Sequence, residues 1–198
     1  VFYFLFTFSH HSSAQENGNS STPSKPIETL YKTLISIMKK SKELGIQGRY
    51  NTLAPVLANT YDVTAMAKTS VGRTWDTLQP SQKEEILNAF SRMMIATYAS
   101  RFNGYDGEHF EINEVLEQPP SNQLVKTKVV PKTGKPVELN YIVSNDGSRW
   151  RVIDVYFEGK ISEIASRRAE FNSLLKSGGP EGLISSLRQQ GDKLLSSP

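Results

Sequence analysis

The first half of the chain spaces its apolar residues three and four apart, the period of helices that bury one face. Gly45 and Gly48 close the first of these stripes, and Asp62 stands where the N-cap of a later helix is expected, with Gly72 at its end. Ser81 has the position of another N-cap, with Glu84 three residues on as its capping-box partner. The helices predicted from this pattern span residues 26–44, 49–61, 63–71 and 81–102.

The second half changes to a period of two, rich in β-branched and aromatic residues, which predicts strands. Turn-forming residues separate these segments, and Asn145-Asp146-Gly147 predicts a hairpin turn because Asn and Gly accept positive φ. Short connections between consecutive strands indicate an antiparallel meander. The predicted strands are residues 110–116, 124–130, 137–143 and 150–157.

Helical spacing returns at Ile161 and is interrupted at Gly178-Gly179-Pro180, which ends one helix and begins another. The whole pattern predicts an α+β fold. N-terminal helices and two C-terminal helices would pack on a curved, mainly antiparallel sheet of four or more strands. We expect one domain over residues 26–198.

The N-terminal segment predicts export. Residues 1–14 combine an apolar run with the small residues Ser12 and Ala14, the pattern at the end of a secretory signal peptide. Residues 15–25 are polar and rich in Asn, Ser and Pro, which predicts a flexible linker.

Composition excludes several classes of site. The net charge of +3 is spread without a basic run, which disfavours a nucleic-acid binder. The absence of cysteine excludes thiol catalysis, cysteine-ligated zinc and disulfides. His10 and His11 fall in the predicted signal segment, so His109 alone cannot build a multi-histidine zinc site. No phosphate-binding or dinucleotide glycine motif is present. We therefore predict no cofactor, no metal and no catalytic constellation.

Two charged residues fall on apolar faces. Arg168 lies on the helical stripe of Ile164 and Phe171, and it must extend to solvent, pair with an acid or meet an anionic ligand head. The acids within reach in sequence are Asp154, Glu158 and Glu170. The period of two predicts that Asp154 shares one face of its strand with Trp150 and Val152. A carboxylate buried on such a face needs a polar partner.

At these residues the chain resembles the periplasmic MlaC/toluene-tolerance family, and most of all its hopanoid-associated HpnM branch. The resemblance covers residues 27–187. The chain departs from the usual pattern at Arg167 and Lys160. The matching residues are Tyr61-Asp62-Val63-Thr64-Ala65-Met66-Ala67, Val71-Gly72-x-x-Trp75, Leu78-x-Pro80-x-Gln82, Tyr98-Ala99-x-Arg101-Phe102, Gly107-Glu108-x-Phe110, Trp150-x-Val152-x-Asp154, Glu158-Gly159-x-Ile161-Ser162, Arg168, Phe171, Leu174-Leu175, Gly179, Gly182-Leu183 and Leu187.

The resemblance implies a periplasmic lipid carrier that holds a phospholipid or a hopanoid between the sheet and its covering helices. It also implies an inner-membrane ABC transporter with an MCE-domain ring and an outer-membrane lipoprotein–porin complex as partners. On this reading the fold encloses an apolar cavity. The predicted lining residues are Tyr31, Leu34, Met38, Phe90, Met93, Met94, Tyr98, Phe102, Leu139, Tyr141, Val143, Val155, Phe157, Ile161, Ile164 and Arg168.

Two other interpretations stay open. A small cone-shaped α+β enzyme would place a polar cluster around Asp154 or His109 in its pocket. An interaction module without a ligand would use the same apolar residues to fill its core completely.

Overall fold

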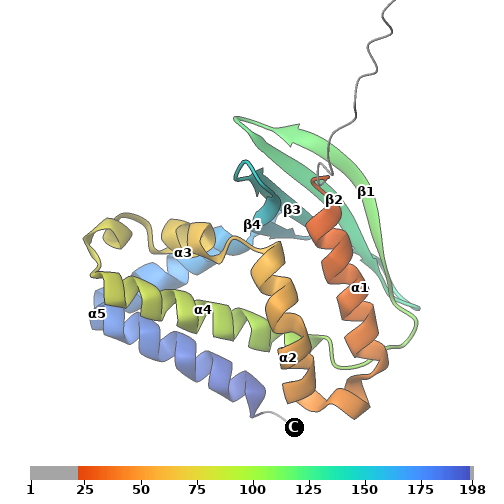
Figure 1. The fold of residues 1–198 in the computed structure, drawn as a ribbon, viewed down its shortest axis with the longest axis horizontal. Coiled ribbons are helices and arrows are strands. Elements are labelled where there is room, and N and C mark those ends of the chain that lie inside the picture. The colour runs from red at the N-terminus through yellow and green to blue at the C-terminus, as the bar shows by residue number, and fades with distance from the viewer. Residues whose placement is uncertain (1–21, 197–198) are drawn as a thin grey trace, which may run out of the picture.

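The computed structural model describes residues 22–196, so the predicted signal segment and most of the predicted linker lie outside the described residues. Helices come first, strands second and the broken helical segment α5 last (Figure 1). This order confirms the predicted α+β class. The elements are α1 (Lys25–Lys39), α2 (Ser41–Thr60), α3 (Val63–Val71), the 3₁₀ turn η1 (Gly72–Thr77), α4 (Pro80–Arg101), β1 (His109–Gln118), β2 (Asn122–Val130), β3 (Val137–Asn145), β4 (Trp150–Phe157), β5 (Ile161–Ser162) and α5 (Glu163–Leu195).

The sheet is an antiparallel meander with the strand order β1-β2-β3-β4-β5, as the short connections predict. The fifth strand was not predicted. It takes Ile161 and Ser162, which the helical pattern assigned to the next helix. Ser162 instead caps α5, because its side chain accepts a hydrogen bond from the backbone N–H of Ala165.

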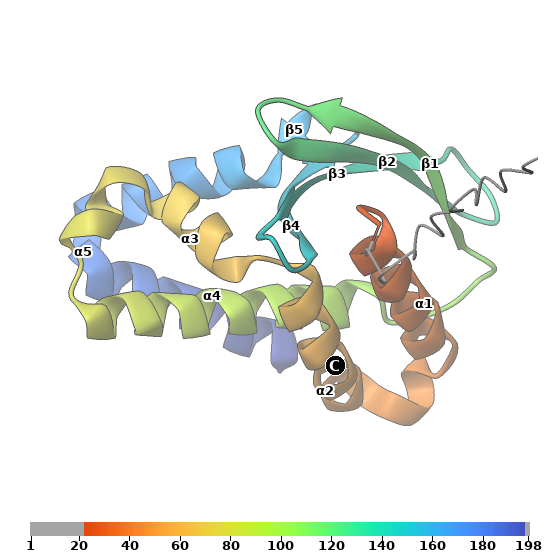
Figure 2. The same ribbon diagram turned by 45° about the horizontal axis from the view of Figure 1, so that its top comes forward.

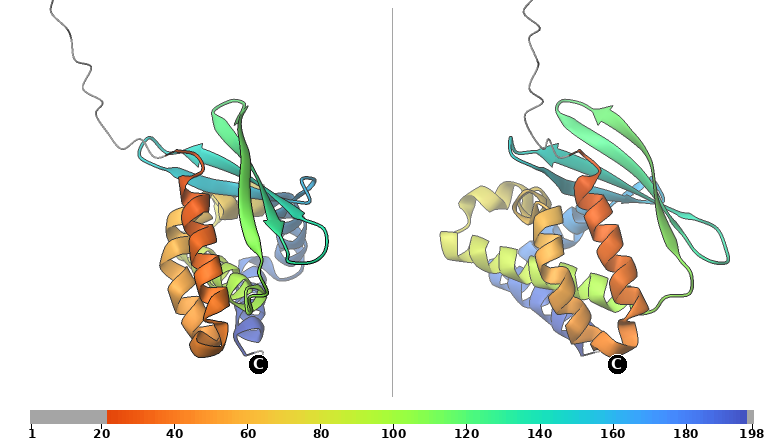
Figure 3. Two further views of the ribbon diagram at one scale, coloured as in Figure 1. Left: turned by 90° about the vertical axis from the view of Figure 1, so that its right-hand side faces the viewer. Right: turned by 45° about the vertical axis from the view of Figure 1, so that its right-hand side comes forward.

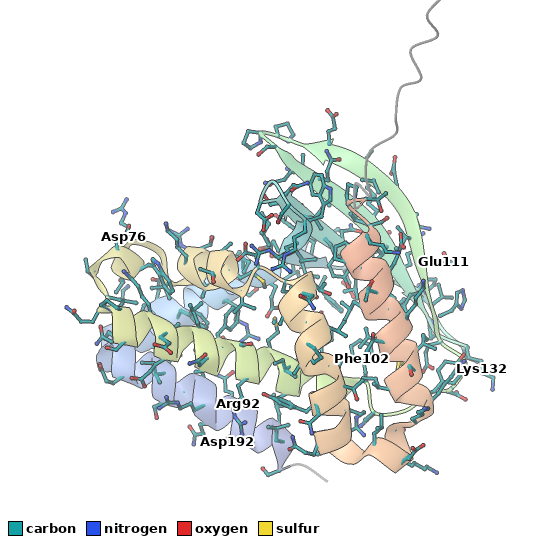
Figure 4. The ribbon with its side chains drawn as sticks, in the orientation of Figure 1. Asp76, Arg92, Phe102, Glu111, Lys132 and Asp192 are labelled. Atoms are coloured by element: carbon teal, nitrogen blue, oxygen red, sulfur yellow. The ribbon has the colours of Figure 1, made fainter. Side chains whose placement is uncertain are left out.

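The sheet curves over the helices and leaves its other face to solvent (Figure 2). α1 and α2 stand side by side under one part of the sheet (Figure 3). α4 packs along α5, where Arg92 and Asp192 form an ion pair of 2.6 Å on the surface (Figure 4). Within residues 22–196, none of the helices is both long and apolar enough to span a bilayer.

Helix ends follow the predicted chemistry in most places. The Asp62 side chain accepts from the Ala65 N–H and caps α3, and Gly72 follows its last residue with a φ of 68°. The prediction for α4 is wrong by two residues. Gln79 is its N-cap and forms the capping box with Gln82, because Pro80 already occupies the first helical position.

Two glycines break the helices in which they lie. Gly45 has a non-helical φ of 57° and ψ of −176° inside α2, and the predicted helix over residues 26–44 already stops at Lys39. Gly48 is helical. Gly179 has a non-helical φ of 63° and ψ of −164° inside α5, and Pro180 follows it. The segment α5 is therefore two helices joined at this break, which confirms the predicted pair of C-terminal helices.

A bulge in β4 changes which face its residues use. Val155 pairs with Tyr141 and Asp154 with Ile142, but Val143 pairs with Val152, so one residue is inserted between them. Val152 and Val155 therefore share the face of Tyr141. Asp154 lies on the opposite face, and the prediction that it shares a face with Val152 is wrong.

Arg49 of α2 ties this helix to α4. Its Nε donates to the Ala99 carbonyl at 2.8 Å, near the end of α4, and its Nη1 donates to the Ser41 carbonyl at 3.0 Å, at the start of α2. The residue is 8% exposed, and burial lowers the pKa of its guanidinium.

Replacing Arg49 with Ala should lower the free energy of unfolding by about 2–3 kcal/mol, because it leaves a buried carbonyl without a donor. Urea denaturation measures this loss. Arg101→Ala, an exposed change on α4, is the matched control and should cost less than about 0.5 kcal/mol. Equal stability of both variants would contradict the assigned role.

Candidate functional site

Aromatic side chains occupy the space between the sheet and the helices, where the cavity was predicted. Tyr31 of α1 stacks on Phe110 of β1 with ring centroids 4.2 Å apart. Phe102, labelled at the end of α4 in Figure 4, lies between Phe110 and Tyr98, at 6.3 Å and 5.7 Å. The inner aromatic cluster, as we call it, comprises Tyr31, Tyr61, Tyr98, Phe102, Phe110 and Tyr141.

Hydroxyl groups in this cluster bond to one another. The Tyr31 hydroxyl is hydrogen-bonded to Thr127 at 2.5 Å and to Tyr141 at 3.2 Å. Thr127 in turn donates to the Leu139 carbonyl. A second pair joins the hydroxyls of Tyr61 and Tyr98. Buried hydroxyls need such partners, because burying one without a hydrogen bond costs about 1–3 kcal/mol.

Burial makes these tyrosines weaker acids than a tyrosine exposed to water. It raises the pKa of Tyr31 and Tyr98 to about 12, although their hydrogen bonds to Thr127 and Tyr61 lower it in part. Burial also raises the pKa of Tyr61 and Tyr141 well above its usual range. The hydroxyls therefore stay neutral at physiological pH and are available as hydrogen-bonding groups.

Polar contacts hold one side of the sheet to the helices. Arg151 of β4 pairs with Asp62 at 2.9 Å and with Asp146 at 3.0 Å. The Asp62 N–H donates to the Val152 carbonyl at 2.9 Å. These bonds are concentrated on β4 and the turn before it, whereas β1 meets α1 through the stacked rings of Tyr31 and Phe110.

An apolar rim lies where β4 and β5 pair. Phe157 and Ile161 are register partners and are 47% and 55% exposed. The Asp154 carboxylate secures the following turn. It accepts from the Ser162 hydroxyl at 2.7 Å and from the Ile164 N–H at 3.1 Å. The polar partner expected for Asp154 is thus the start of α5.

Arg168 does not lie on a buried stripe. Its side chain is exposed and its guanidinium rests against Gly72, where an added Cβ would lie 3.6 Å from Nη2. None of the three acids considered above forms an ion pair with it within the described residues. Arg167 takes the pairing role instead, with Glu163 and Glu170 at 2.8 Å and 2.9 Å.

The predicted lining residues differ in burial. Tyr31, Leu34, Met38, Phe90, Met93, Met94, Tyr141, Val143 and Ile164 are buried. Tyr98, Phe102, Leu139 and Val155 are partly buried, and Phe157, Ile161 and Arg168 are exposed.

The structure brings only some of them together. Tyr31, Tyr98, Phe102 and Tyr141 meet in the inner aromatic cluster. Phe90 instead packs edge-on against Phe171 at 5.6 Å, in the contact between α4 and α5.

Three residues of the cluster region were not among the predicted lining residues. Thr127 is 1% exposed and alternates with Val125 and Val129 along β2, so the strand period alone could have placed it inside. Tyr61 ends the apolar stripe of α2. Phe110 begins the alternation of β1, and only tertiary packing shows that it stacks on Tyr31.

Two surface grooves lie elsewhere. One of about 1080 Å³ follows the second half of α5 and is lined by polar residues such as Glu85, Arg188 and Asp192. The other, of about 290 Å³, lies between Pro26, Val56 and Trp150. Neither contains a predicted lining residue. No group of three or more acidic or histidine side chains in residues 22–196 is arranged to hold a metal ion.

Alkaline pH should destabilise the fold through the buried tyrosines. Unfolded tyrosine loses its proton near pH 10, whereas Tyr31 and Tyr98 keep theirs to about 12 when folded. The unfolded state then binds fewer protons, so the free energy of unfolding falls as the pH rises above about 10. Urea denaturation from about pH 8 to about pH 11 measures the fall, and Tyr98→Phe should make it shallower. Full tyrosinate absorbance in the folded protein near pH 10 would contradict this account.

Comparison with known proteins agrees with this architecture. A phospholipid-binding protein from Ralstonia solanacearum, solved in complex with a phospholipid, has a similar structure with a TM-score of 0.77. The two chains are 20% identical, and the match covers 88% of this chain and 99% of the other. At this identity the likeness shows a shared fold. The MlaC protein family matches residues 28–189, most of the length of the chain. The chain therefore belongs to the MlaC family.

Proposed function

We propose that this protein is a periplasmic lipid carrier that shelters acyl chains between its sheet and its helices. The observation that carries the proposal is the inner aromatic cluster, an apolar interior placed under a curved sheet in a chain of the MlaC family. The similar protein from Ralstonia solanacearum, which binds a phospholipid, supports it. Binding, not catalysis, is the activity proposed.

Ligand entry requires the sheet and the helices to separate. The β4 side is held by the ion pairs of Arg151 and by the backbone bond to Asp62. The β1 side depends on ring stacking between Tyr31 and Phe110. Acyl chains can replace such apolar contacts with little net cost, because both states keep apolar surface away from water. We infer that the β1 edge opens, while the β4 side stays fixed and Tyr31 keeps α1 bonded to β2 and β3.

Burial of the ligand supplies the driving force. Each sheltered methylene contributes about 0.8 kcal/mol, so two long acyl chains contribute on the order of 20 kcal/mol before the interior is opened. A lipid bound with that energy stays with its carrier in transit. Release then needs a partner, for which we propose an MCE-type ABC transporter and an outer-membrane lipoprotein–porin complex. A hopanoid is the alternative cargo.

Protein purified from the periplasm should carry one or more lipids that native mass spectrometry detects. Val155→Trp, on the helix-facing side of β4, should reduce the lipid-bound fraction at least about tenfold, because the indole takes the space of an acyl chain. Ile142→Trp lies on the other face of the sheet and is the matched control.

The filled interior also agrees with the alternative of an interaction module without a ligand. The same experiment separates the two proposals. Protein that carries no lipid and does not take up phospholipid from vesicles would overturn the carrier proposal and favour the module.

Arg168 is proposed to contact the head of an anionic lipid beside the rim of Phe157 and Ile161. Arg168→Glu should weaken uptake from anionic vesicles about threefold to tenfold and leave uptake from zwitterionic vesicles unchanged. Lys176→Glu, farther along α5, is the control with the same charge change. An equal effect of both variants would show that only net charge matters.

A further inference from the structure

The buried pair of Tyr61 and Tyr98 has more hydrogen-bond donors than it uses. Each tyrosine hydroxyl carries one hydrogen, so the pair carries two. One hydrogen forms the bond between the two oxygens. Within residues 22–196 the second hydrogen has no acceptor, although Tyr61 is only 2% exposed. A free donor in an apolar interior is costly and calls for a partner.

The neighbouring hydroxyls lie deeper. Tyr31 donates to Tyr141 at 3.2 Å, and Thr127 donates to the Leu139 carbonyl. These two bonds use the hydrogens of Tyr31 and Thr127, so the hydrogen of Tyr141 also has no acceptor among these groups. Tyr141 is 1% exposed, whereas Tyr98 is only partly buried. The Tyr61–Tyr98 pair is therefore the more exposed of the two free donors in the inner aromatic cluster.

The pair is held on the fixed side of the sheet. The backbone of Tyr61 bridges to Val152 of β4, and the next residue, Asp62, bonds to the same strand. Tyr98 sits one turn before the end of α4 and is only partly buried. Glu163, at the start of α5, acts electrostatically on both hydroxyls, and Arg101, at the end of α4, acts on that of Tyr98.

Chemistry limits what the free hydrogen can meet. The acceptor must enter an apolar space without a formal charge, because no cation of the described residues bonds to either tyrosine and an unpaired buried anion is far more costly. A phosphate is therefore a poor partner. An ester carbonyl is neutral, accepts hydrogen bonds and lies next to the acyl chain that the interior would shelter.

We propose that the Tyr61–Tyr98 pair donates its free hydroxyl hydrogen to an ester carbonyl oxygen of the bound lipid. One tyrosine donates to the other, and the second donates to the ester, so the two bonds strengthen each other. This inference rests on the proposed lipid-carrier function. It adds a preference for ester-linked acyl chains over chains that lack a carbonyl.

Competition between two phospholipids tests the inference. The pair has the same head group and chain length, one with ester and one with ether linkages, and native mass spectrometry reads out which lipid the delipidated protein takes up. The wild-type protein should prefer the diester lipid about fivefold, the effect of one buried hydrogen bond. Tyr61→Phe/Tyr98→Phe should bind both lipids equally. Thr127→Val removes a buried hydroxyl whose hydrogen is already used by the Leu139 carbonyl, so it should keep the preference.

A measurement on the wild-type protein guards against variants that fold poorly. Infrared spectra of bound lipid with isotope-labelled ester carbonyls should show the shift to lower frequency of a hydrogen-bonded carbonyl. Three results would overturn the inference: equal uptake of the two lipids by the wild-type protein, an unshifted carbonyl band, or a preference that survives in the double variant. The free hydrogen would then be assigned to water. Failure to bind either lipid would instead overturn the carrier proposal, and the inference with it.

Discussion

Hydroxyl groups buried beneath an apolar sheet set the main constraint on this structure. Tyr31, Tyr61, Thr127 and Tyr141 are buried and Tyr98 is partly buried, and each lost hydrogen bond there costs free energy comparable to a sizeable part of a domain's net stability. Their partners come from elements that are far apart in sequence. The hydrogen bonds therefore fix α1 against β2 and β3, and the end of α2 against α4, in a way that apolar contacts alone would not.

The contacts between the sheet and the helices differ at the two edges of the sheet. Ion pairs and backbone bonds gather on β4, next to Asp62 and Arg151. Stacked rings join α1 to β1. Directional polar bonds resist sliding and separation, whereas apolar contacts can be exchanged for other apolar contacts at similar free energy. The proposed opening of the carrier at its β1 edge rests on this difference between apolar and polar contacts.

Particular residues show where sequence patterns predicted the structure correctly and where they did not. The cap at Asp62 and the hairpin at Asn145-Asp146-Gly147 depend on neighbours within four residues, and both were predicted correctly. The cap of α4 was misplaced because Ser81 and Gln79 are both plausible in a local pattern, and Pro80 decides between them. Asp154 was placed on the wrong face because one bulge residue inverts a period of two, and nothing in the strand itself announces the bulge.

Local order in the chain thus determined the helices, the meander, the α+β class and the apolar character of the interior, because these follow from periods and turn chemistry within short windows. Only the tertiary structure decided the pairing of Tyr61 with Tyr98 and the hydroxyl network around Tyr31. It also decided the exposure of Arg168 and the anchoring of the sheet through β4. Each depends on groups that are distant in sequence and meet through packing. A one-dimensional pattern records which side chains point inward, but it does not record which of them touch.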